Sequence, residues 1–430
     1  MIQNNSTEAS ADGIDLSTAS LADPEILAHP NAFYAAMRKD DAVHYDKNLD
    51  MYLISRYEDL QTVLRDPITF SVKKGFAEQY AKGFLKEYKE ILERDGGGFF
   101  VNAIMTDPPE HTRVRRLLDS AFTAHRVKTL QPEITNIAVD LVEKLLAKGE
   151  GEVFSEFAMP MTSRIICKQL GVDLPSATVQ RWALALTQQI SRMQSREDML
   201  RAAKDVCDLQ NFLLAEIKDR QNSPPREDMI SDLVHARLDD ADQPTLGLDE
   251  LVTLGVALLV AGNETTATAL TTMFYIFATR PDIAATLRAS LDDDRVVTRF
   301  VEELLRFDPP VRGITRMTTK DVEVGGVALP KGAHLLLLYA SANDDDSEFD
   351  SPREFDMNRP NIGRHVSFGA GIHRCVGAAL ARMELKVAVR EVLSRMDNIQ
   401  LAIPNDEITY LPTVATHTIA RLPLTFTRRG

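Results

Sequence analysis

The sequence has few cysteines and no excess of positive charge. Three of its 430 residues are cysteine, at positions 167, 207 and 375, which are too few and too scattered for a disulfide framework. Reduced thiols are typical of a cytosolic protein. The formal net charge is −14, so the chain does not have the lysine and arginine surplus that binding to nucleic-acid phosphates requires. A local basic patch is compatible with this total, so an acidic protein partner stays possible.

The chain also shows no apolar leader, no internal repeat and no long low-complexity linker. Its first 20 residues are polar and do not resemble a signal peptide. We therefore expect residues 1–20 to form a mobile N-terminal tail on a cytoplasmic protein without a membrane anchor. Hydrophobic residues make up 44% and charged residues 26%, an ordinary globular balance that provides for a large core.

Hydrophobic periodicity predicts a mainly helical chain with minor β-sheets. Helices are expected near both ends of residues 24–66, with two short strands between them, and residues 70–105 look irregular. From about 110 to 310 the pattern predicts successive amphipathic helices broken at Pro160, Pro175, Pro224–Pro225 and Pro281. Strands are expected over 311–345 around Gly325–Gly326 and over 400–428, and a last helix from about 376 to 396.

One apolar segment, residues 251–278, is long enough to cross a bilayer. Its centre contains Gly262, Asn263 and Glu264, which are costly in hydrocarbon unless they face a protein cavity. We therefore predict a helix buried inside a large protein.

The strongest local signal is the segment FGAGIHRCVG, residues 368–377. Glycines at 369, 371 and 377 are expected to supply positive φ and a close backbone approach, which would bring N–H groups to the Cys375 sulfur. A cysteine on such a bare loop suits a thiolate ligand of a haem iron. Cys167 and Cys207 have no such context, and we expect them to be small buried hydrophobic residues.

This segment resembles the haem-binding signature of the cytochrome P450 family, Phe-Gly-x-Gly-x-(His or Arg)-x-Cys-x-Gly, at every defined position. The resemblance extends from about residue 24 to the end of the chain. It implies a P450-like fold, mainly α with minor β-sheets, as one large haem domain over residues 21–430. It also implies haem b (iron protoporphyrin IX) as cofactor, Cys375 as the iron ligand, and Phe368 and Gly369 beside the cofactor.

A second element is Glu303–Leu304–Leu305–Arg306, whose acid and base share one helix face. By composition alone this would be a solvated surface pair of little energetic value. In the family the pair is buried and joined by a downstream arginine, which implies a structural ion-pair trio of Glu303, Arg306 and Arg359.

The third element, residues 261–266 (AGNETT), lies within the long apolar helix. The family has a distorted helix here that accommodates dioxygen beside Ala261, and an acid and an alcohol that deliver protons. Glu264 and Thr265 match these catalytic roles, and Thr266 is a weaker match. The alternative is that the threonines only bond carbonyls of the preceding turn.

Further positions match family residues that contact the haem propionates: His111, Arg115, Arg316, His365 and His373. Any one of these histidines alone is an ordinary surface or core residue. As a set of cations and donors around a dianionic group, they are chemically reasonable.

Family-matched positions also predict an apolar substrate pocket, held mostly by shape. Arg312 is a candidate carboxylate anchor there, but an outward salt bridge is the favoured interpretation. The expected pocket residues are Phe99, Phe100, Val101, Ala257, Val260, Val311, Gly313, Ile314 and Val414.

The resemblance thus implies a monooxygenase that inserts one oxygen atom of O2 into a hydrophobic small molecule of terpenoid, steroid or aromatic type. Electrons would come from a separate ferredoxin, docked at a patch containing Arg374 and the basic residues of 111–128. A solvated arginine face on an acidic protein explains that patch equally well. The alternatives are a peroxide-driven peroxygenase and a non-catalytic haem sensor or carrier; the Glu264–Thr265 pair argues against both.

Overall fold

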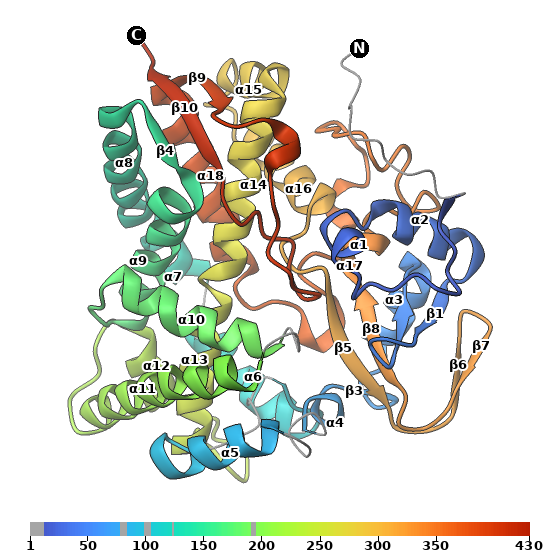
Figure 1. Ribbon diagram of the computed structural model, residues 1–430. Helices are drawn as coiled ribbons and strands as arrows, with labels where there is room; N and C mark the ends of the chain where they lie inside the picture. Colours follow the sequence, from blue (N-terminus) through green and yellow to red (C-terminus); the bar gives the residue numbers. More distant parts are fainter. Residues whose placement is uncertain (1–12, 78–83, 99–104, 123, 191–194) are drawn as a thin grey trace.

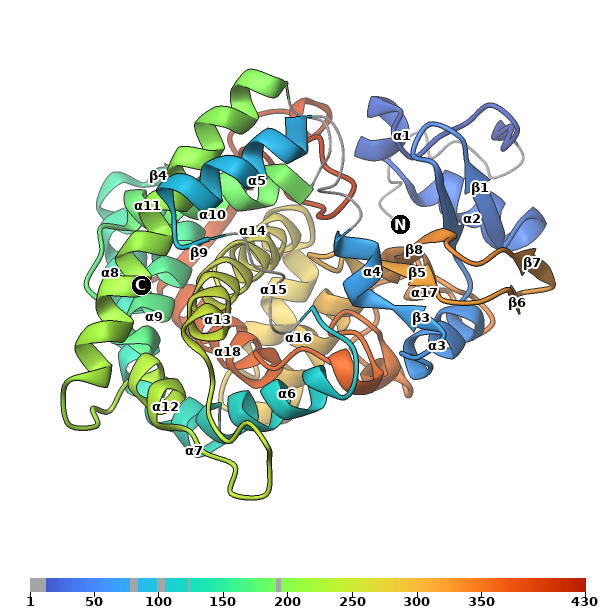
Figure 2. The ribbon, with the colours of Figure 1, turned by 90° about the horizontal axis from the view of Figure 1, so that it is seen from below.

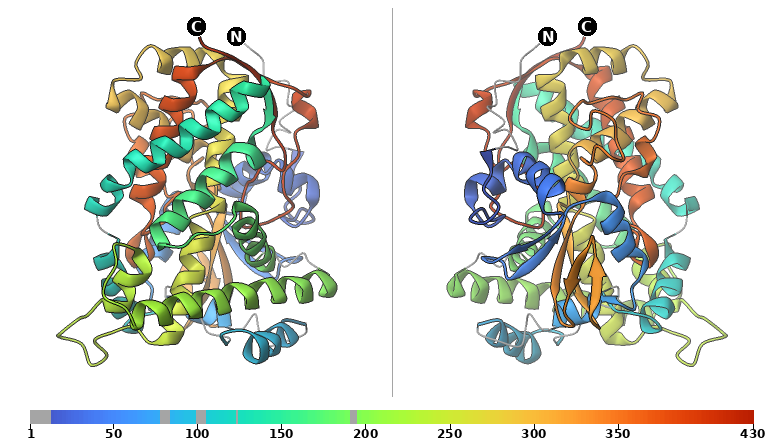
Figure 3. Two further views of the ribbon diagram at one scale, coloured as in Figure 1. Left: turned by 90° about the vertical axis from the view of Figure 1, so that its left-hand side faces the viewer. Right: turned by 90° about the vertical axis from the view of Figure 1, so that its right-hand side faces the viewer.

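Helices make up most of the protein, and its largest sheet lies on one side of them (Figure 1). The computed structural model describes residues 13–77, 84–98, 105–122, 124–190 and 195–430. Mainly helical structure with small sheets is confirmed, and the view in Figure 3 shows a helical flank with α8 (Gln131–Lys148) and α9 (Met159–Leu170) opposite a flank with strands and the N-terminal helices.

The N-terminal part has the predicted order of helices and strands. Its elements are α1 (Pro24–Ala28), α2 (Asn31–Asp40), β1 (Val43–Asp46), β2 (Met51–Ile54) and α3 (Tyr57–Arg65). Residues ahead of α1 also pack against this body, because Ser20 is buried and its hydroxyl donates to Asp46 at 2.8 Å. Residues 1–12 lie outside the described part.

A five-stranded sheet joins this region to the middle of the chain. Its order is β1-β2-β8-β5-β3, with β3 at Phe70–Ser71, β5 at Gly313–Thr318 and β8 at His334–Leu338. β2 runs parallel to β8, and the other neighbours are antiparallel. A hairpin of β6 (Val322–Val324) and β7 (Val327–Leu329) turns at Gly325 and Gly326, which have φ of 56° and 81°, so the predicted glycine turn is confirmed.

The helical part is built around the long apolar segment, which forms α13 (Leu248–Ala261) and α14 (Glu264–Thr279). Figure 2 shows these two helices passing through the middle of the molecule, with α9 and α11 on one side and β5 and β8 on the other. By length and composition the stretch 248–279 could cross a membrane, but 67% of its most apolar window is buried inside the protein. It is the central core helix that we predicted.

The remaining helices surround this centre. They are α4 (Val72–Ala77), α5 (Phe84–Asp95), α6 (Glu110–Ala121), α7 (Ala124–Thr129), α10 (Ser176–Ile190), α11 (Arg196–Gln221), α12 (Met229–His235), α15 (Pro281–Arg288), α16 (Asp294–Phe307), α17 (Tyr339–Ala342) and α18 (Ala378–Arg395). The largest core cluster packs α8, α14, α16 and α18 together. It therefore holds α18, which begins directly after the loop that contains Cys375.

Three predictions about elements need correction. Residues 84–95 are a helix rather than irregular chain, because Tyr88 and Leu92 on one face pack against α11. Pro160 does not break the chain: it lies in the first turn of α9, where no backbone donor is needed, directly after the π-helical turn Phe154–Ala158. Strands within 400–428 are limited to the end of β9 (Met396–Leu401) and to β10 (Pro423–Arg428); β10 lies between β9 and β4 (Glu150–Glu152) and pairs with both.

Candidate functional site

The loop that contains Cys375 is a tight turn between η4 (Ile362–Arg364) and α18. Gly369 and Gly371 both have φ of +66°, and a Cβ on Gly371 would lie 2.4 Å from the carbonyl oxygen of Leu64. Only glycine fits at that position. Gly377 differs from our expectation, because its φ is −79° and a Cβ there would make only an ordinary contact with the Cys375 sulfur, at 3.8 Å.

Donors converge on the Cys375 sulfur. The N–H groups of Gly377 and Ala378 point to the sulfur. The backbone N–H of Cys375 itself donates to the carbonyl of Phe368 at 2.8 Å. Burial raises the pKa of the thiol, while these amides and the charges of Arg115 and Arg382 act to lower it. Cys375 is nevertheless an exposed residue, so accessible space borders it.

The other two cysteines are different. Cys167 and Cys207 are buried in separate core clusters, as predicted, and burial raises the pKa of Cys167 to about 11. Neither thiol is suited to act as a ligand or nucleophile. Cys375 is therefore the cysteine of the chain with a chemically active environment.

The central helix breaks at Gly262–Asn263, between α13 and α14. Asn263 is fully buried, and its Oδ1 accepts hydrogen bonds from Thr162 Oγ1 at 2.5 Å and Ser163 Oγ at 3.2 Å on α9. A buried amide that two hydroxyls hold keeps the break in one geometry. Sequence reasoning did not assign this role to Asn263, although a polar residue inside an apolar helix was a usable signal.

One stripe of the central helix is left uncovered at this break. Ala261 is exposed and Ala257 and Thr265 are half-buried, at a spacing of four residues that places them on one face. Thr265 Oγ1 donates to the carbonyl of Ala261 at 2.7 Å, which is the local bond of the alternative interpretation and also orients the hydroxyl. Glu264 lies beside it in the first turn of α14 and is buried, as is Thr266.

A buried cation and an imidazole are available to an anionic group. Arg316 is 2% exposed, donates to the carbonyl of Thr315, and has no ion-pair partner among the described residues. The Nε2 atom of His111 is buried and likewise has no hydrogen-bond partner in the described part of the chain. The His111 and His373 rings lie 4.2 Å apart, and burial lowers the pKa of His111, followed by the charge of Arg115.

The other two predicted propionate residues have protein partners. Arg115 donates to the carbonyls of Arg374 (2.7 Å) and Ile372 (3.4 Å) and pairs with Asp119, so it holds the cysteine loop. His365 is bonded through Nε2 to Glu302 at 3.0 Å, and its Nδ1 accepts the N–H of Ser367.

Glu303 and Arg306, the predicted structural ion pair, are fully buried. Arg306 donates twice to Glu303, at 2.8 and 2.9 Å, and both side chains are 0% exposed. Arg359 completes the trio at 3.4 Å from Glu303. Arg306 also donates to the carbonyls of Asn343 and Pro352, and Asn343 in turn holds the backbone of Val366 ahead of the cysteine loop. Through Asn343, the Glu303–Arg306–Arg359 trio therefore fixes the backbone just ahead of the cysteine loop.

Only some of the predicted pocket residues belong to the described part of the chain. Phe99, Phe100 and Val101 lie outside the described residues. Ala257 and Val260 lie on α13, at its open stripe. The remaining predicted pocket residues lie in the two segments that the isolated Val311–Thr416 bridge joins. Their exposures are as follows: Ala257, Val260, Val311, Ile314 and Val414 are half-buried and Gly313 is buried.

The favoured interpretation of Arg312, an outward salt bridge, is wrong. The residue is 0% exposed and donates to the carbonyls of Thr416 (2.8 Å) and Leu27 (2.5 Å). Arg312 joins the N-terminal and C-terminal segments.

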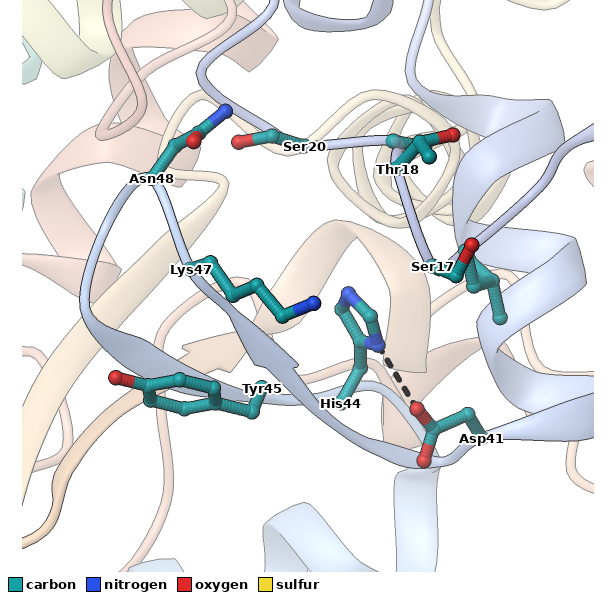
Figure 4. Close-up of a pocket in the computed structure, with 10 residues that line it drawn as sticks. Ser17, Thr18, Ser20, Asp41, His44, Tyr45, Lys47 and Asn48 are labelled. Atoms are coloured by element: carbon teal, nitrogen blue, oxygen red, sulfur yellow. Dashed lines mark hydrogen bonds and ion pairs between the residues drawn. The ribbon is translucent and has the colours of Figure 1, made fainter.

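A surface hollow of about 380 Å³ lies elsewhere, in the N-terminal segment. Figure 4 shows His44 in it, bonded to Asp41 at 2.8 Å, with Lys47, Tyr45 and three hydroxyl residues around it. None of its lining residues belongs to the predicted site, and the hollow is open and polar.

The residues around Cys375 fit the haem that the resemblance implies. No group of three or more His, Cys, Asp or Glu side chains among the described residues could hold a bare metal ion, so iron would need ligands of its own. A single sulfur with two N–H donors suits one axial ligand. Arg316 and the free Nε2 of His111 suit the carboxylates of a propionate.

Comparisons with known proteins agree over nearly the whole chain. A family model described as cytochrome P450 matches residues 82–398. Cytochrome P450 107B1 of Saccharopolyspora erythraea is 33% identical over 414 residues, which cover 93% of this chain and 98% of the relative. The 6-deoxyerythronolide B hydroxylase of the same organism is 31% identical over 377 residues, 87% of this chain and 90% of that one. The solved structure of P450BioI in complex with a hexadec-9Z-enoic acid ligated acyl carrier protein superposes with a TM-score of 0.83 at 28% identity, and covers 94% of this chain and 99% of that chain.

Proposed function

The chain belongs to the cytochrome P450 family and is a haem-dependent monooxygenase, and on this premise we propose that it inserts one oxygen atom of O2 into a hydrophobic small molecule with electrons from a separate ferredoxin. The observation that carries the proposal is Cys375, an exposed residue on a glycine-bounded loop with two N–H donors to its sulfur. Residues 21–430 are proposed to form the haem domain.

Bound haem supplies the iron at which dioxygen is activated, and an electron-rich thiolate favours that chemistry. The task of Cys375 is to remain a thiolate, and the N–H groups of Gly377 and Ala378 stabilise the negative sulfur. Arg316, His111 and His373 are proposed to hold the propionates, since they provide a buried cation and ring donors in one region. Arg115 and His365 are proposed to act mainly through the loop, as their present partners indicate.

Glu264 and Thr265 are proposed to move protons into the site. The Thr265 hydroxyl donates to Ala261, so the lone pairs of Oγ1 stay available to accept a proton from an acid or a water. Glu264 is buried next to it and is the proposed source. The break at Gly262–Asn263 provides the room, because Ala261 presents only a methyl group to the open stripe.

The substrate is proposed to be apolar and bound mainly by shape. Ala257, Val260, Val311, Ile314 and Val414 present small or branched apolar surfaces, which suit terpenoid, steroid or aromatic compounds. Arg312 is not available as an anchor because it is buried between backbone carbonyls. A relative named as a hydroxylase supports oxygen insertion as the reaction.

The electron donor is proposed to dock near Arg374, which is exposed. Much of the neighbouring basic charge is compensated internally, since Arg113 pairs with Glu250, Arg115 with Asp119 and Arg116 with Asp240. The docking patch is therefore small, and binding should be sensitive to salt. A carrier-protein partner is an alternative that one structural neighbour suggests. The proposed location is the cytoplasm.

Reconstitution tests the proposal. The purified holoenzyme is given NADPH, ferredoxin reductase and ferredoxin, or hydrogen peroxide alone, with apolar compounds selected by a high-spin shift of the Soret band. Oxygenated product in the ferredoxin reaction supports the proposal, and turnover with hydrogen peroxide but not with ferredoxin and NADPH overturns the electron source. Cys375→Ala should abolish the carbon monoxide spectrum typical of sulfur-ligated haem; a retained spectrum would overturn the ligand assignment.

A further inference from the structure

A second ion pair involves the residue next to Glu303 and joins α16 to α18. Arg382 of α18 donates to both oxygens of Glu302, at 2.6 and 2.7 Å. The Glu302 side chain is 12% exposed and that of Arg382 is 26% exposed. Although burial alone raises the pKa of Glu302, the bonds from Arg382 and His365 bring it down to about 2. Both groups are therefore charged at any working pH.

His365 is the third member of this cluster. Its Nε2 lies 3.0 Å from Glu302, and its Nδ1 accepts the N–H of Ser367 at 3.3 Å. These two contacts fix the imidazole ring beside the Glu302–Arg382 pair.

The positive end of the pair lies against the cysteine loop. The guanidinium carbon of Arg382 is 4.4 Å from the centre of the Phe368 ring, a cation–π contact. The carbonyl of Phe368 accepts the N–H of Cys375. The positive charge of Arg382 is therefore held next to the loop that contains the sulfur.

We propose that Glu302 and Arg382 are positioning residues that set the electrostatic field at the Cys375 sulfur and so tune the reduction potential of the bound haem in opposite directions. Reduction of the iron by one electron makes the iron–sulfur unit more negative. Arg382 then favours the reduced form and Glu302 the oxidised form. The inference rests on Cys375 as the haem ligand, part of the proposed function.

Potentiometric titration of the holoenzyme with dithionite, followed through the Soret band, tests the proposal. Arg382→Gln should lower the potential and Glu302→Gln should raise it, each by a two- to tenfold change in the ferric–ferrous equilibrium constant; tenfold is about 59 mV for one electron. The double variant E302Q/R382Q removes both charges and should return close to the wild-type value.

Arg390 provides a matched control on the same helix. It also joins α18 to α16, through Asp294 at 2.7 Å, and its side chain is 28% exposed. It lies eight residues further along α18, about 12 Å from Arg382 along the helix axis and beyond a Debye length at physiological salt. Arg390→Gln makes the same chemical change and should leave the potential unchanged.

The signs separate the outcomes. Shifts in opposite directions with recovery in the double variant support the proposal. Shifts in the same direction, no shift, or an equal shift in Arg390→Gln overturn it, because a purely structural role has no reason to reverse with the sign of the charge. Carbon monoxide spectra of the same samples show whether sulfur ligation is present, so a wrong ligand assignment is distinguishable from a wrong tuning assignment.

Discussion

At the scale of the residue, hydrogen-bond partners separate side chains that hold the structure from those available for chemistry. Thr265 and Thr271 make the same bond, a hydroxyl donating to the carbonyl four residues earlier, at 2.7 and 2.9 Å. Thr271 is 0% exposed, whereas Thr265 lies half-buried on the open stripe of the central helix. Position, and not the local bond, gives Thr265 its proposed role.

Thr265→Ala should uncouple electron use from product formation. Without the hydroxyl, proton delivery loses its positioned carrier, and we expect product per NADPH to fall about tenfold or more while hydrogen peroxide rises. The measurements are NADPH consumption, peroxide and product in one reaction. Thr271→Ala is the control and should leave coupling unchanged. Wild-type coupling in Thr265→Ala would contradict the role, provided that the substrate-induced Soret shift is retained.

Single residues could be predicted where the signal is local. The cysteine loop was recognisable because its glycines and Cys375 lie within ten residues of one another. The partner of His365 could not be predicted, because Glu302 is 63 residues away in the sequence. The family motif also drew attention to the adjacent Glu303 instead. Arg312 was placed at the surface because arginine usually is, and only its distant carbonyl partners reverse that expectation.

At the scale of the element, the break between α13 and α14 depends on a neighbouring helix. The buried amide of Asn263 binds two hydroxyls on α9, so the geometry of the break is fixed from outside the helix that contains it. A helix interrupted only by glycine would have several ways to bend. Periodicity predicted one apolar helix here, and the fixed break could not be derived from that pattern.

Asn263→Ala should weaken the protein measurably. Removal of the amide leaves the buried Ser163 hydroxyl without this acceptor, which costs about 1–3 kcal/mol in free energy of unfolding, whereas Thr162 can still donate to the carbonyls of Ala158 and Met159. Urea unfolding of the holoenzyme, followed by circular dichroism, measures the change. The exposed Asn211, whose side chain donates to the carbonyl of Asp95, is the control, and Asn211→Ala should change stability by less than about 0.5 kcal/mol. Equal effects of the two variants would contradict an anchoring role.

Glu384 makes α18 sensitive to pH. It is 2% exposed, and burial raises its pKa well above the usual 4.5. The folded state therefore keeps the proton, so this contribution to stability is complete below pH 4.5 and is lost as the pH rises through the folded-state pKa. Relative to Glu384→Gln, wild-type stability should fall by about 1.4 kcal/mol per pH unit over that window. Parallel pH profiles of urea unfolding for both proteins would contradict this; Glu391→Gln on the same helix controls for loss of a carboxylate.

At the scale of the whole molecule, one side chain joins regions distant in sequence. Arg312 donates to the carbonyl of Leu27 near the start of the chain and to that of Thr416 near its end. Its own backbone N–H binds Ala415, and its carbonyl accepts the N–H of Ala340. The order of elements and the family signature were sufficient to predict the fold, but not this junction, because its partners are separated by 104 and 285 residues.

Arg312→Ala should destabilise the holoenzyme more than any surface arginine. It leaves two buried carbonyls unpaired, at about 1–3 kcal/mol each, and removes one of the largest buried side chains. The measurement is the midpoint of urea unfolding, with limited proteolysis of residues 408–420 as a local probe. Arg421→Ala, at an exposed site on the same C-terminal segment, is the control. An unchanged midpoint together with unchanged protection of 408–420 would contradict the assignment.

The last strand, β10, lies between β9, which directly precedes it among the strands, and β4, which is far earlier in the chain; Thr425 is opposite both Glu150 and Gln400. During synthesis Cys375 is made before this strand. β4 and β9 can be joined in one sheet only after the last residues of the chain, which form β10, have been made. Premature termination ahead of residue 423 would leave two unpaired strand edges exposed, and such edges are templates for aggregation. A chain that ends ahead of residue 423 would therefore be more prone to aggregation than the full-length chain, although it contains the whole cysteine loop.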